Sequence, residues 1–341
     1  MKGRQIVLDH LDGREAAALM VDGRLEDLLV DGGGQPRPGT IYRAQADRPM
    51  KGQGGMFVTT PDGKAFLRQV KGLSPGQTIL VQVTGHAEPG KAMPVTTKLL
   101  FKSRYAIVTP GAAGLNISRS IRDDDQRDAL LMIAHEAMGG SDLGLILRSA
   151  CAGAGPEEIA EDIRAMHDLA TTVMADAEGA PETLTEGDSP HLLAWRDWAE
   201  PADVVTEPGA FEALGVRDQI ESLTLPQVPL PGGAAMFIEP TRALVAVDVN
   251  TGNETGHAAG LRVNIAAARD LPRQLRLRGL GGQITLDLAP MPKKDRKTFE
   301  AALRAAFRTD QVETALVGWT PLGHYELQRK RDRIPLKDLL E

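Results

Sequence analysis

Two aspartates and one asparagine interrupt apolar segments of this 341-residue sequence in a pattern that suits metal chemistry. Asp248 and Asn250 break the β-branched run "LVAVDVNTG", and Asp287 ends the run "QITLD". An ionised carboxylate that is buried without a partner is strongly destabilising. Asp248 is therefore expected either in a turn that faces water or beside a bound cation. A second carboxylate nearby favours the cation.

The segment between the two aspartates predicts how they meet. "NIAAARDLPRQLRLRGLGG" predicts a helix that Pro272 breaks or kinks and that Gly279 ends. A strand–helix–strand crossover places two parallel strands side by side, with their carboxyl ends at one edge of the sheet, where ligands bind. Mg²⁺ takes one or two carboxylates and keeps several waters, so Asp248 and Asp287 suit it. Asn250 lies two residues after Asp248, on the same face, and would orient a carboxylate or a metal-bound water.

The absence of other catalytic patterns narrows the chemistry. No histidine is paired in the sequence with a carboxylate near these residues, and neither a GxSxG motif nor a glycine-rich phosphate loop followed by lysine occurs. A hard cation held by two carboxylates polarises a phosphoryl oxygen and lowers the pKa of a bound water. The pattern thus indicates metal-assisted hydrolysis of a phosphodiester.

The charge of the chain is unevenly distributed. The net charge is −7, but residues 261–341 contain 16 Lys and Arg against 10 Asp and Glu, a net charge of +6. Residues 1–260 have a net charge of −13. This asymmetry predicts a basic C-terminal face that could hold a polyanion. Arg273, Arg276 and Arg278 of the predicted helix are spaced so that they cannot all share one face.

Composition excludes several classes of protein. A single cysteine, Cys151, excludes an internal disulfide, and without CxxC or clustered histidines a thiolate zinc site is not expected. No apolar run approaches the roughly 20 residues of a membrane span. The N-terminal "MKGRQIVLDH" has no signal-peptide core, so we expect a cytoplasmic protein.

The N-terminal third predicts β-structure. Residues 3–9 and 16–30 predict three short strands with a hairpin turn at "VDGR", and residues 31–39 mark a boundary. Five strand-like segments follow, which predict a small barrel, most commonly an OB-fold: "TIYRAQ", "GGMFVTT", "KAFLRQV", "QTILVQV" and "YAIVTP". Phe57 and Phe66 fall on neighbouring strands, either as core or as a stacking platform for bases.

Beyond Gly111 the pattern becomes helical. "SRSIRDDDQRDALLMIAHEAM" predicts a helix, "LGLILRSACAG" a buried strand ending at Arg148 and Ser149, and Pro156 opens a second helix. An arginine and a hydroxyl before a helix N-terminus suit an anion, although a surface arginine without a ligand is the simpler interpretation. Residues 179–233 are irregular, with a short helix in "GVRDQIESL".

Two long blocks, "FIEPTRALVAVDVNTG" and "NIAAARDLPRQLRLRGLGGQITLDLAPM", resemble the bacterial ribonuclease E/G endoribonucleases. The resemblance implies that Asp248 and Asp287 bind a catalytic Mg²⁺ and that Asn250 supports them. It extends to "GLNISRSI" and "LGLILRSA", where the family recognises RNA. The other positions that it implies are Phe57, Phe66 and Lys91 for RNA contact in the OB-fold, Arg119 for the RNA backbone, and Arg148 with Ser149 for a 5′-monophosphate.

The resemblance also implies an architecture, an α/β (α+β) multidomain chain. Residues 1–35 and 180–230 would form a split, degenerate RNase H-like subdomain. Residues 36–110 would form an inserted OB-fold domain and residues 111–179 a 5′-sensor region. Residues 231–341 would form a DNase I-like catalytic subdomain.

The implied function is a Mg²⁺-dependent endoribonuclease that cuts single-stranded RNA and favours 5′-monophosphorylated substrates. The alternative is an RNA-binding regulatory paralogue with little or no cleavage; the joint presence of Asp248, Asn250 and Asp287 favours the enzyme. A structural OB protein without an RNA role would leave the basic C-terminal blocks unexplained. The family's CPxC zinc link does not occur in these residues, and Pro290 replaces a second family acid. We therefore expect a monomer or weak dimer without a zinc-linked assembly.

Overall fold

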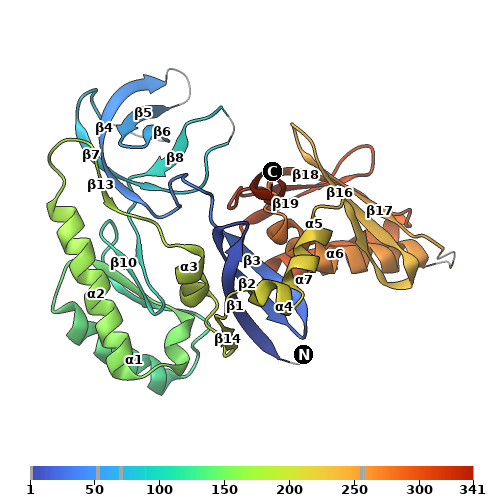
Figure 1. Cartoon of the computed structure of the whole chain (residues 1–341), viewed down its shortest axis with the longest axis horizontal. Helices are drawn as coiled ribbons and strands as arrows, with labels where there is room; N and C mark the ends of the chain where they lie inside the picture. Colours follow the sequence, from blue (N-terminus) through green and yellow to red (C-terminus); the bar gives the residue numbers. More distant parts are fainter. Residues whose placement is uncertain are drawn as a thin grey trace. The chain divides into compact units, whose positions relative to one another are not determined.

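The computed structural model describes residues 3–50, 54–68, 72–88, 90–253, 256 and 258–340. It shows a mixed α/β protein in which these residues form several sheets and a small barrel (Figure 1). The chain divides into two compact units. One unit consists of Met1–Val30 and Asp203–Glu341, and the other, inserted between them in sequence, consists of Asp31–Ala202.

The inserted unit begins with the barrel. Its strands follow the order β4-β5-β6-β8-β7, β7 pairs back with β4, and β13 (Glu182–Thr185) adds beside β4. The barrel strands are β4 (Ile41–Met50), β5 (Gly55–Thr60), β6 (Gly63–Leu67), β7 (Thr78–Val83) and β8 (Met93–Thr96). The first four were predicted, but the assignment of "YAIVTP" as the fifth is wrong. The short β8, which contains Pro94, closes the barrel instead, and its weak strand pattern hid it.

The rest of this unit is a four-stranded sheet with helices. "YAIVTP" supplies β10 (Ala106–Thr109), which pairs antiparallel with β9 and β12, while β11 runs parallel to β12. The other elements are β9 (Phe101–Lys102), β11 (Leu115–Ile117), α1 (Asp124–Met138), β12 (Gly144–Leu147), η1 (Ser149–Gly153), α2 (Pro156–Ala175) and α3 (Pro190–Asp197). The predicted helices at α1 and α2 are confirmed. Asp123 caps α1 by accepting a hydrogen bond from the Gln126 backbone, and Pro156 opens α2.

The first sheet of the other unit has the order β14-β1-β2-β3. The predicted hairpin is confirmed, because Asp22 and Gly23 both have positive φ, as the tight turn of a two-residue hairpin requires. Two short helices and the C-terminal helix pack on this sheet. The elements are β1 (Arg4–Leu11), β2 (Arg14–Val21), β3 (Arg24–Val30), β14 (Asp203–Val205), α4 (Ala210–Ala213), α5 (Val216–Leu223) and α8 (Leu336–Leu340).

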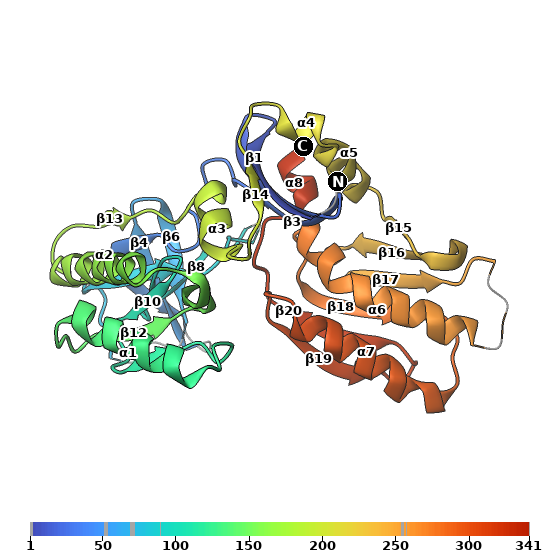
Figure 2. The ribbon, with the colours of Figure 1, turned by 90° about the horizontal axis from the view of Figure 1, so that it is seen from below.

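The second sheet of this unit has six strands in the order β15-β16-β17-β18-β20-β19. Figure 2 shows α6 and α7 lying along one face of it, where Leu271, Phe299 and Leu303 are buried. The elements are β15 (Gln227–Pro229), η2 (Pro231–Gly233), β16 (Ala235–Pro240), β17 (Val245–Asn250), α6 (Ala259–Leu277), β18 (Gly282–Asp287), η3 (Lys293–Asp295), α7 (Arg296–Arg308), β19 (Thr314–Trp319) and β20 (Tyr325–Arg329).

The helix between the two carboxylate strands does not break at Pro272. α6 runs without interruption through this buried proline, so the predicted break is wrong. The predicted end at Gly279 is confirmed: its φ of 64° is left-handed, and a Cβ there would lie 2.2 Å from the carbonyl oxygen of Ile334. Glycine is thus required for the close approach that turns the chain into β18.

Candidate active site

The two predicted metal-binding aspartates lie side by side. β17 and β18 pair in parallel, and their register places Asp248 opposite Asp287, as the crossover pattern predicts. In β17 the buried residues alternate with exposed ones, so the side chains of Asp248 and Asn250 lie on the face opposite the helices. Neighbouring strands are about 4.8 Å apart, which brings both carboxylates within reach of one ligand.

Asn250 is oriented by the turn that follows it. Its Oδ1 accepts a hydrogen bond from the backbone N–H of Gly252 at 2.9 Å. Gly252 has a φ of 58°, and a Cβ there would lie 2.2 Å from the carbonyl oxygen of Gly233. The residues "NTG" thus form a tight turn that packs closely against Gly233, and only glycine fits at position 252. With Oδ1 engaged, the Asn250 amide offers its NH₂ group as a donor on the face of Asp248.

A histidine beside Asp287 was missed from the sequence. Nε2 of His324 lies 3.7 Å from Oδ1 of Asp287, so the inference that no histidine pairs with a carboxylate here is wrong. β20 runs antiparallel to β18 in a register that places His324, the residue before β20, opposite Asp287. The side chains of His324 and Asp287 are 36% and 69% exposed, so both are accessible from solvent. On the other side, Phe237 of β16 is opposite Asp248.

Basic side chains follow the same edge of the sheet. The chain leaves β18 at Asp287 and enters η3 and α7, where Lys293, Lys294 and Lys297 are exposed. The Arg296 guanidinium stacks 4.1 Å from the ring centre of Trp319, at the end of β19. These cations follow Asp287 in the chain by six to ten residues.

The pair of Asp248 and Asp287 suits an open site for a hard divalent cation that keeps bound waters, rather than a site closed on all sides by protein ligands. Asp248 and Asp287 are both exposed, and Mg²⁺ usually takes one or two carboxylates and retains waters. Across the residues that the structure describes, no group of three or more His, Cys, Asp or Glu could hold a metal ion. A structural zinc site, which needs four protein ligands, has no counterpart among them.

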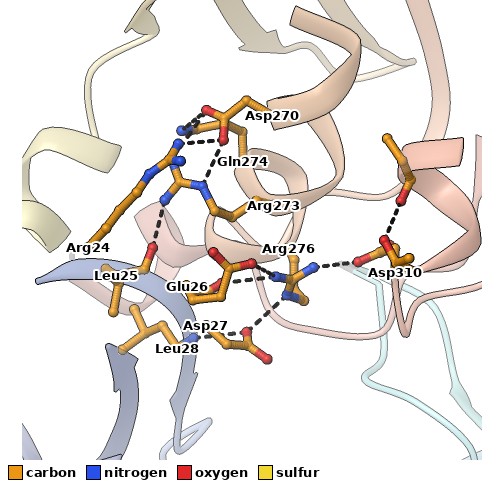
Figure 3. Close-up of polar contacts among 12 residues, drawn as sticks. Arg24, Leu25, Glu26, Asp27, Leu28, Asp270, Arg273, Gln274, Arg276 and Asp310 are labelled. Atoms are coloured by element: carbon orange, nitrogen blue, oxygen red, sulfur yellow. Dashed lines mark hydrogen bonds and ion pairs between the residues drawn. The ribbon is translucent and has the colours of Figure 1, made fainter. Parts of the chain in front are cut away.

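The arginines near the end of α6, whose spacing predicts that they cannot all share one face, are each held by partners within their unit. Arg276 pairs with Glu26 and Asp27 of β3 and with Asp310 beyond α7 (Figure 3). Arg273 binds both oxygens of Asp270, and Arg278 is buried. The charges of Arg276 and Arg273 are thus paired inside the unit, whereas Arg278 donates to the neutral groups of Gln274 and Leu225. The basic character near the carboxylates comes from η3 and α7 instead.

In the barrel, Phe57 and Phe66 are paired across β5 and β6. Their ring centres are 5.3 Å apart with planes at 56°, and both side chains are partly exposed. Neither belongs to the buried apolar core of the barrel. The Phe66 ring covers Gly55, and Arg48 lies 5.7 Å from the Phe57 ring centre, a cation that the sequence did not single out.

Two further predicted RNA contacts lie on exposed turns. Lys91 lies between β7 and β8, where its Nζ pairs with Glu88 at 2.9 Å. Arg119 is exposed just after β11. Because β11 and β12 are parallel, Arg119 and Ser149 both follow the carboxyl ends of neighbouring strands.

Arg148 is placed at that edge but already has protein partners. Its guanidinium binds Asp197 at 2.6 Å and donates to the carbonyl oxygens of Ser103 and Arg196. Burial raises the pKa of Asp197, but hydrogen bonds and charge from Arg196 and Arg148 outweigh it and hold the pKa below its usual value. A phosphate bound by Arg148 would therefore compete with Asp197. Ser149 is exposed at the start of η1.

Comparison with known proteins decides the family. A sequence model of the Ribonuclease E/G family matches residues 101–203 and 199–332. The chain belongs to the ribonuclease E/G family. These matches include all three residues of the carboxylate site, and the resemblance inferred from the sequence is confirmed.

Individual relatives extend the match over most of the chain. Ribonuclease G of Escherichia coli K12 is 27% identical over 365 residues, which cover 89% of this chain and 74% of the relative. Ribonuclease G of Salmonella typhimurium gives the same values. Ribonuclease E of Synechocystis sp. is 26% identical, covering 98% of this chain and 58% of the relative.

A membrane-spanning helix is not found: within the described ranges, no helix is both long and apolar enough.

Proposed function

We propose that this family member is a Mg²⁺-dependent endoribonuclease that hydrolyses phosphodiester bonds in single-stranded RNA. The observation that supports it most is the register of β17 and β18. It pairs Asp248 with Asp287 near the carboxyl ends of these two neighbouring strands, where both residues are exposed. Two carboxylates without a cation between them would repel each other, so their pairing has no structural benefit of its own. The names of the relatives, ribonuclease G and ribonuclease E, support RNA as the substrate.

The residues around the pair have separate tasks. When bound, a divalent cation at Asp248 and Asp287 would act as a Lewis acid toward a phosphoryl oxygen and activate water. Asn250 would fix the Asp248 carboxylate or a phosphate oxygen through its NH₂ group. His324 would orient Asp287 from the opposite side. Arg296 and the exposed lysines of η3 and α7 would hold the neighbouring phosphates of the RNA.

The experiment that tests this function is cleavage of an A/U-rich single-stranded RNA by the purified protein. We expect internal cuts with Mg²⁺, none with excess EDTA, and recovery when Mg²⁺ is restored. The same sequence in a duplex should be resistant, as the proposed selectivity for single strands requires. Cleavage that persists in excess EDTA would contradict the proposal, and binding without cleavage would favour the regulatory paralogue.

We also propose that the sheets correspond to the family's subdomains. The sheet of β1, β2, β3 and β14 would be the RNase H-like part, and the closed barrel the OB-fold. The sheet of β9 to β12 with α1 and α2 would be the 5′-sensor. The six-stranded sheet would be the DNase I-like catalytic part.

The aromatic pair of the barrel should contribute to RNA affinity. Replacing Phe66 with alanine removes one half of the platform, and stacking of one base on an aromatic ring is worth about 1–3 kcal/mol. We expect a fall in affinity of about five- to 150-fold, measured by fluorescence anisotropy with a labelled single-stranded RNA in EDTA. Phe66→Tyr keeps the ring and should bind as the wild type does. Equal affinity of Phe66→Ala and the wild type would show that the rings do not contact RNA.

The 5′ end of the RNA should affect the rate of cleavage. A terminal phosphate offers several oxygens to Arg148 and to the hydroxyl of Ser149, with Arg119 at the same edge of the sheet. We expect 5′-monophosphorylated RNA to be cut faster than the 5′-hydroxyl form at limiting substrate. Arg148→Ala should reduce this preference by about ten- to a hundredfold, the loss of one charge-assisted contact.

The ratio of the two rates separates sensing from stability. If Arg148 only anchors Asp197, its replacement would slow both substrates equally and leave the ratio unchanged. Arg164→Ala, which removes an exposed arginine of α2, is the control and should keep the wild-type ratio. Equal rates on both RNAs in the wild type would exclude 5′-end sensing.

A further inference from the structure

A cavity of about 540 Å³ opens between α5, β15 and the second half of α6, within the unit of residues 3–30 and 203–340. α6 starts near the carboxyl end of β17 and ends before β18 begins, so the cavity lies toward the opposite edge of the sheet from Asp248 and Asp287. It is therefore separate from the proposed active site. Its volume is in the range of small-molecule pockets.

The cavity walls carry an excess of positive charge. Arg24, Arg273 and Arg278 line it, and Asp270 is the one acidic residue among its lining residues. Asp270 is shared, because Arg24 binds it at 2.6 Å and Arg273 binds both of its oxygens, at 2.8 and 3.2 Å. Arg24 and Arg273 thus share a single carboxylate.

Arg278 forms no ion pair with Asp270. It is 6% exposed, and its guanidinium donates to the side-chain oxygen of Gln274 and to the carbonyl oxygen of Leu225. No carboxylate of the described residues forms an ion pair with it. Burial and the charge of Arg273 lower the pKa of Arg278 to about 10, against the smaller opposing effect of Asp270. A cation buried without a counter-charge is costly unless a ligand supplies one.

The arginines of the neighbouring ion network, unlike Arg278, have carboxylate partners. Arg276 is paired with Glu26, Asp27 and Asp310 (Figure 3). Arg329 is paired with Asp310, and Arg333 with Asp27. Each of these three arginines meets at least one carboxylate. The cavity beside this network is built from the same helix yet has two more cations than anions.

We infer that this cavity binds a small phosphorylated molecule the size of a nucleoside monophosphate. Gln274 and Leu225 accept from two of the five N–H donors of Arg278, and a bound phosphate would accept from the others. Arg24, which is 57% exposed, closes the phosphate site from the rim. Leu25, Leu223, Val228 and Leu277 line the rest of the cavity and provide apolar contact for the body of the ligand.

The test is isothermal titration calorimetry of the full chain with adenosine 5′-monophosphate in EDTA. We expect one site, and binding at least about tenfold weaker in Arg278→Met, which removes a charge-assisted contact. Inorganic phosphate should also bind at least about tenfold more weakly than the nucleotide, since it makes no apolar contact. Arg269→Ala, an exposed arginine of α6 that does not line the cavity, is the matched control and should bind as the wild type does.

Two surface variants keep the test valid if Arg278→Met does not fold. Arg24→Ala should weaken binding, and Ser222→Trp, at an exposed lining position, should block it. No binding by the wild type at millimolar nucleotide, unchanged affinity in all three variants, or equal affinity for inorganic phosphate would overturn the inference. Displacement of the nucleotide by a short single-stranded RNA would also overturn it, because the cavity would then belong to the RNA path. The Asp248→Asn/Asp287→Asn variant should bind normally, so the test does not depend on the proposed nuclease activity.

Discussion

Replacing Asp287 with asparagine should lower the rate of RNA cleavage by at least about a hundredfold while the fold and RNA affinity are kept. Asparagine has the same shape but lacks the negative charge that holds a divalent cation, and Lewis-acid assistance is worth several kcal/mol. Asp287 is 69% exposed and at a strand end, so its replacement leaves no buried group unpaired. Cleavage is measured under single-turnover conditions, and RNA affinity separately in EDTA.

Asp248→Asn should have a similar effect, and the double variant should be little slower than either single one. Both carboxylates act on the same cation, so the second replacement removes a contribution that is already lost. The control is Glu313→Gln, an exposed carboxylate next to β19 at the opposite edge of the sheet, which should cleave at the wild-type rate. Additive losses in the double variant, or a full rate in Asp287→Asn, would show that the pair is not a single metal site.

Replacing Asp27 with asparagine should destabilise its unit by about 3–5 kcal/mol, because it breaks a buried ion network. Asp27 is 3% exposed and pairs with Arg333 at 2.5 Å and with Arg276 at 3.3 Å. Its loss leaves two partly buried guanidinium groups, those of Arg276 and Arg333, with too little negative charge. Urea denaturation measures the change, and faster hydrogen exchange in β3 and α6 should locate it.

The same network predicts the dependence on pH. Burial raises the pKa of Asp27, but the charge and hydrogen bonds of Arg333 and the charge of Arg276 outweigh it and hold the pKa below its ordinary 3.8. The carboxylate therefore stabilises the fold fully above about pH 5, and this stabilisation is lost as the pH falls through the lower folded-state pKa. The difference between wild type and Asp27→Asn should shrink in acid.

Asp12→Asn serves as the control for this second prediction. Asp12 forms an exposed pair with Arg217 in the same unit, and such surface pairs contribute less than about 1 kcal/mol. An Asp27→Asn protein as stable as Asp12→Asn would show that the buried network does not stabilise the unit.

The carboxylate site was predictable because its geometry is local. The β-branched alternation around Asp248, the helix after it and the strand ending at Asp287 lie within residues 245–287, and the handed crossover fixes their arrangement. Strand pairing then follows from chain order alone. The register of β17 with β18 agrees with it.

The partners of His324 and of the arginines in α6 could not be predicted, because both lie far away in the sequence. His324 meets Asp287 only because β20 inserts between β18 and β19, a non-local pairing that no spacing reveals. Arg276 contacts Glu26, which lies 250 residues earlier. A count of charges along the sequence treats such arginines as available for RNA, whereas their partners come from the first strands of the chain.

The most direct test of the metal site is a count of Mn²⁺ bound per chain, by electron paramagnetic resonance, in the wild type and in Asp248→Asn/Asp287→Asn. Mn²⁺ accepts the same oxygen ligands as Mg²⁺ and is visible to the method. We expect one Mn²⁺ bound per wild-type chain, displaced by excess Mg²⁺, and at least about tenfold weaker binding in the folded double variant. Equal Mn²⁺ binding by the two proteins would contradict a metal site at the paired aspartates.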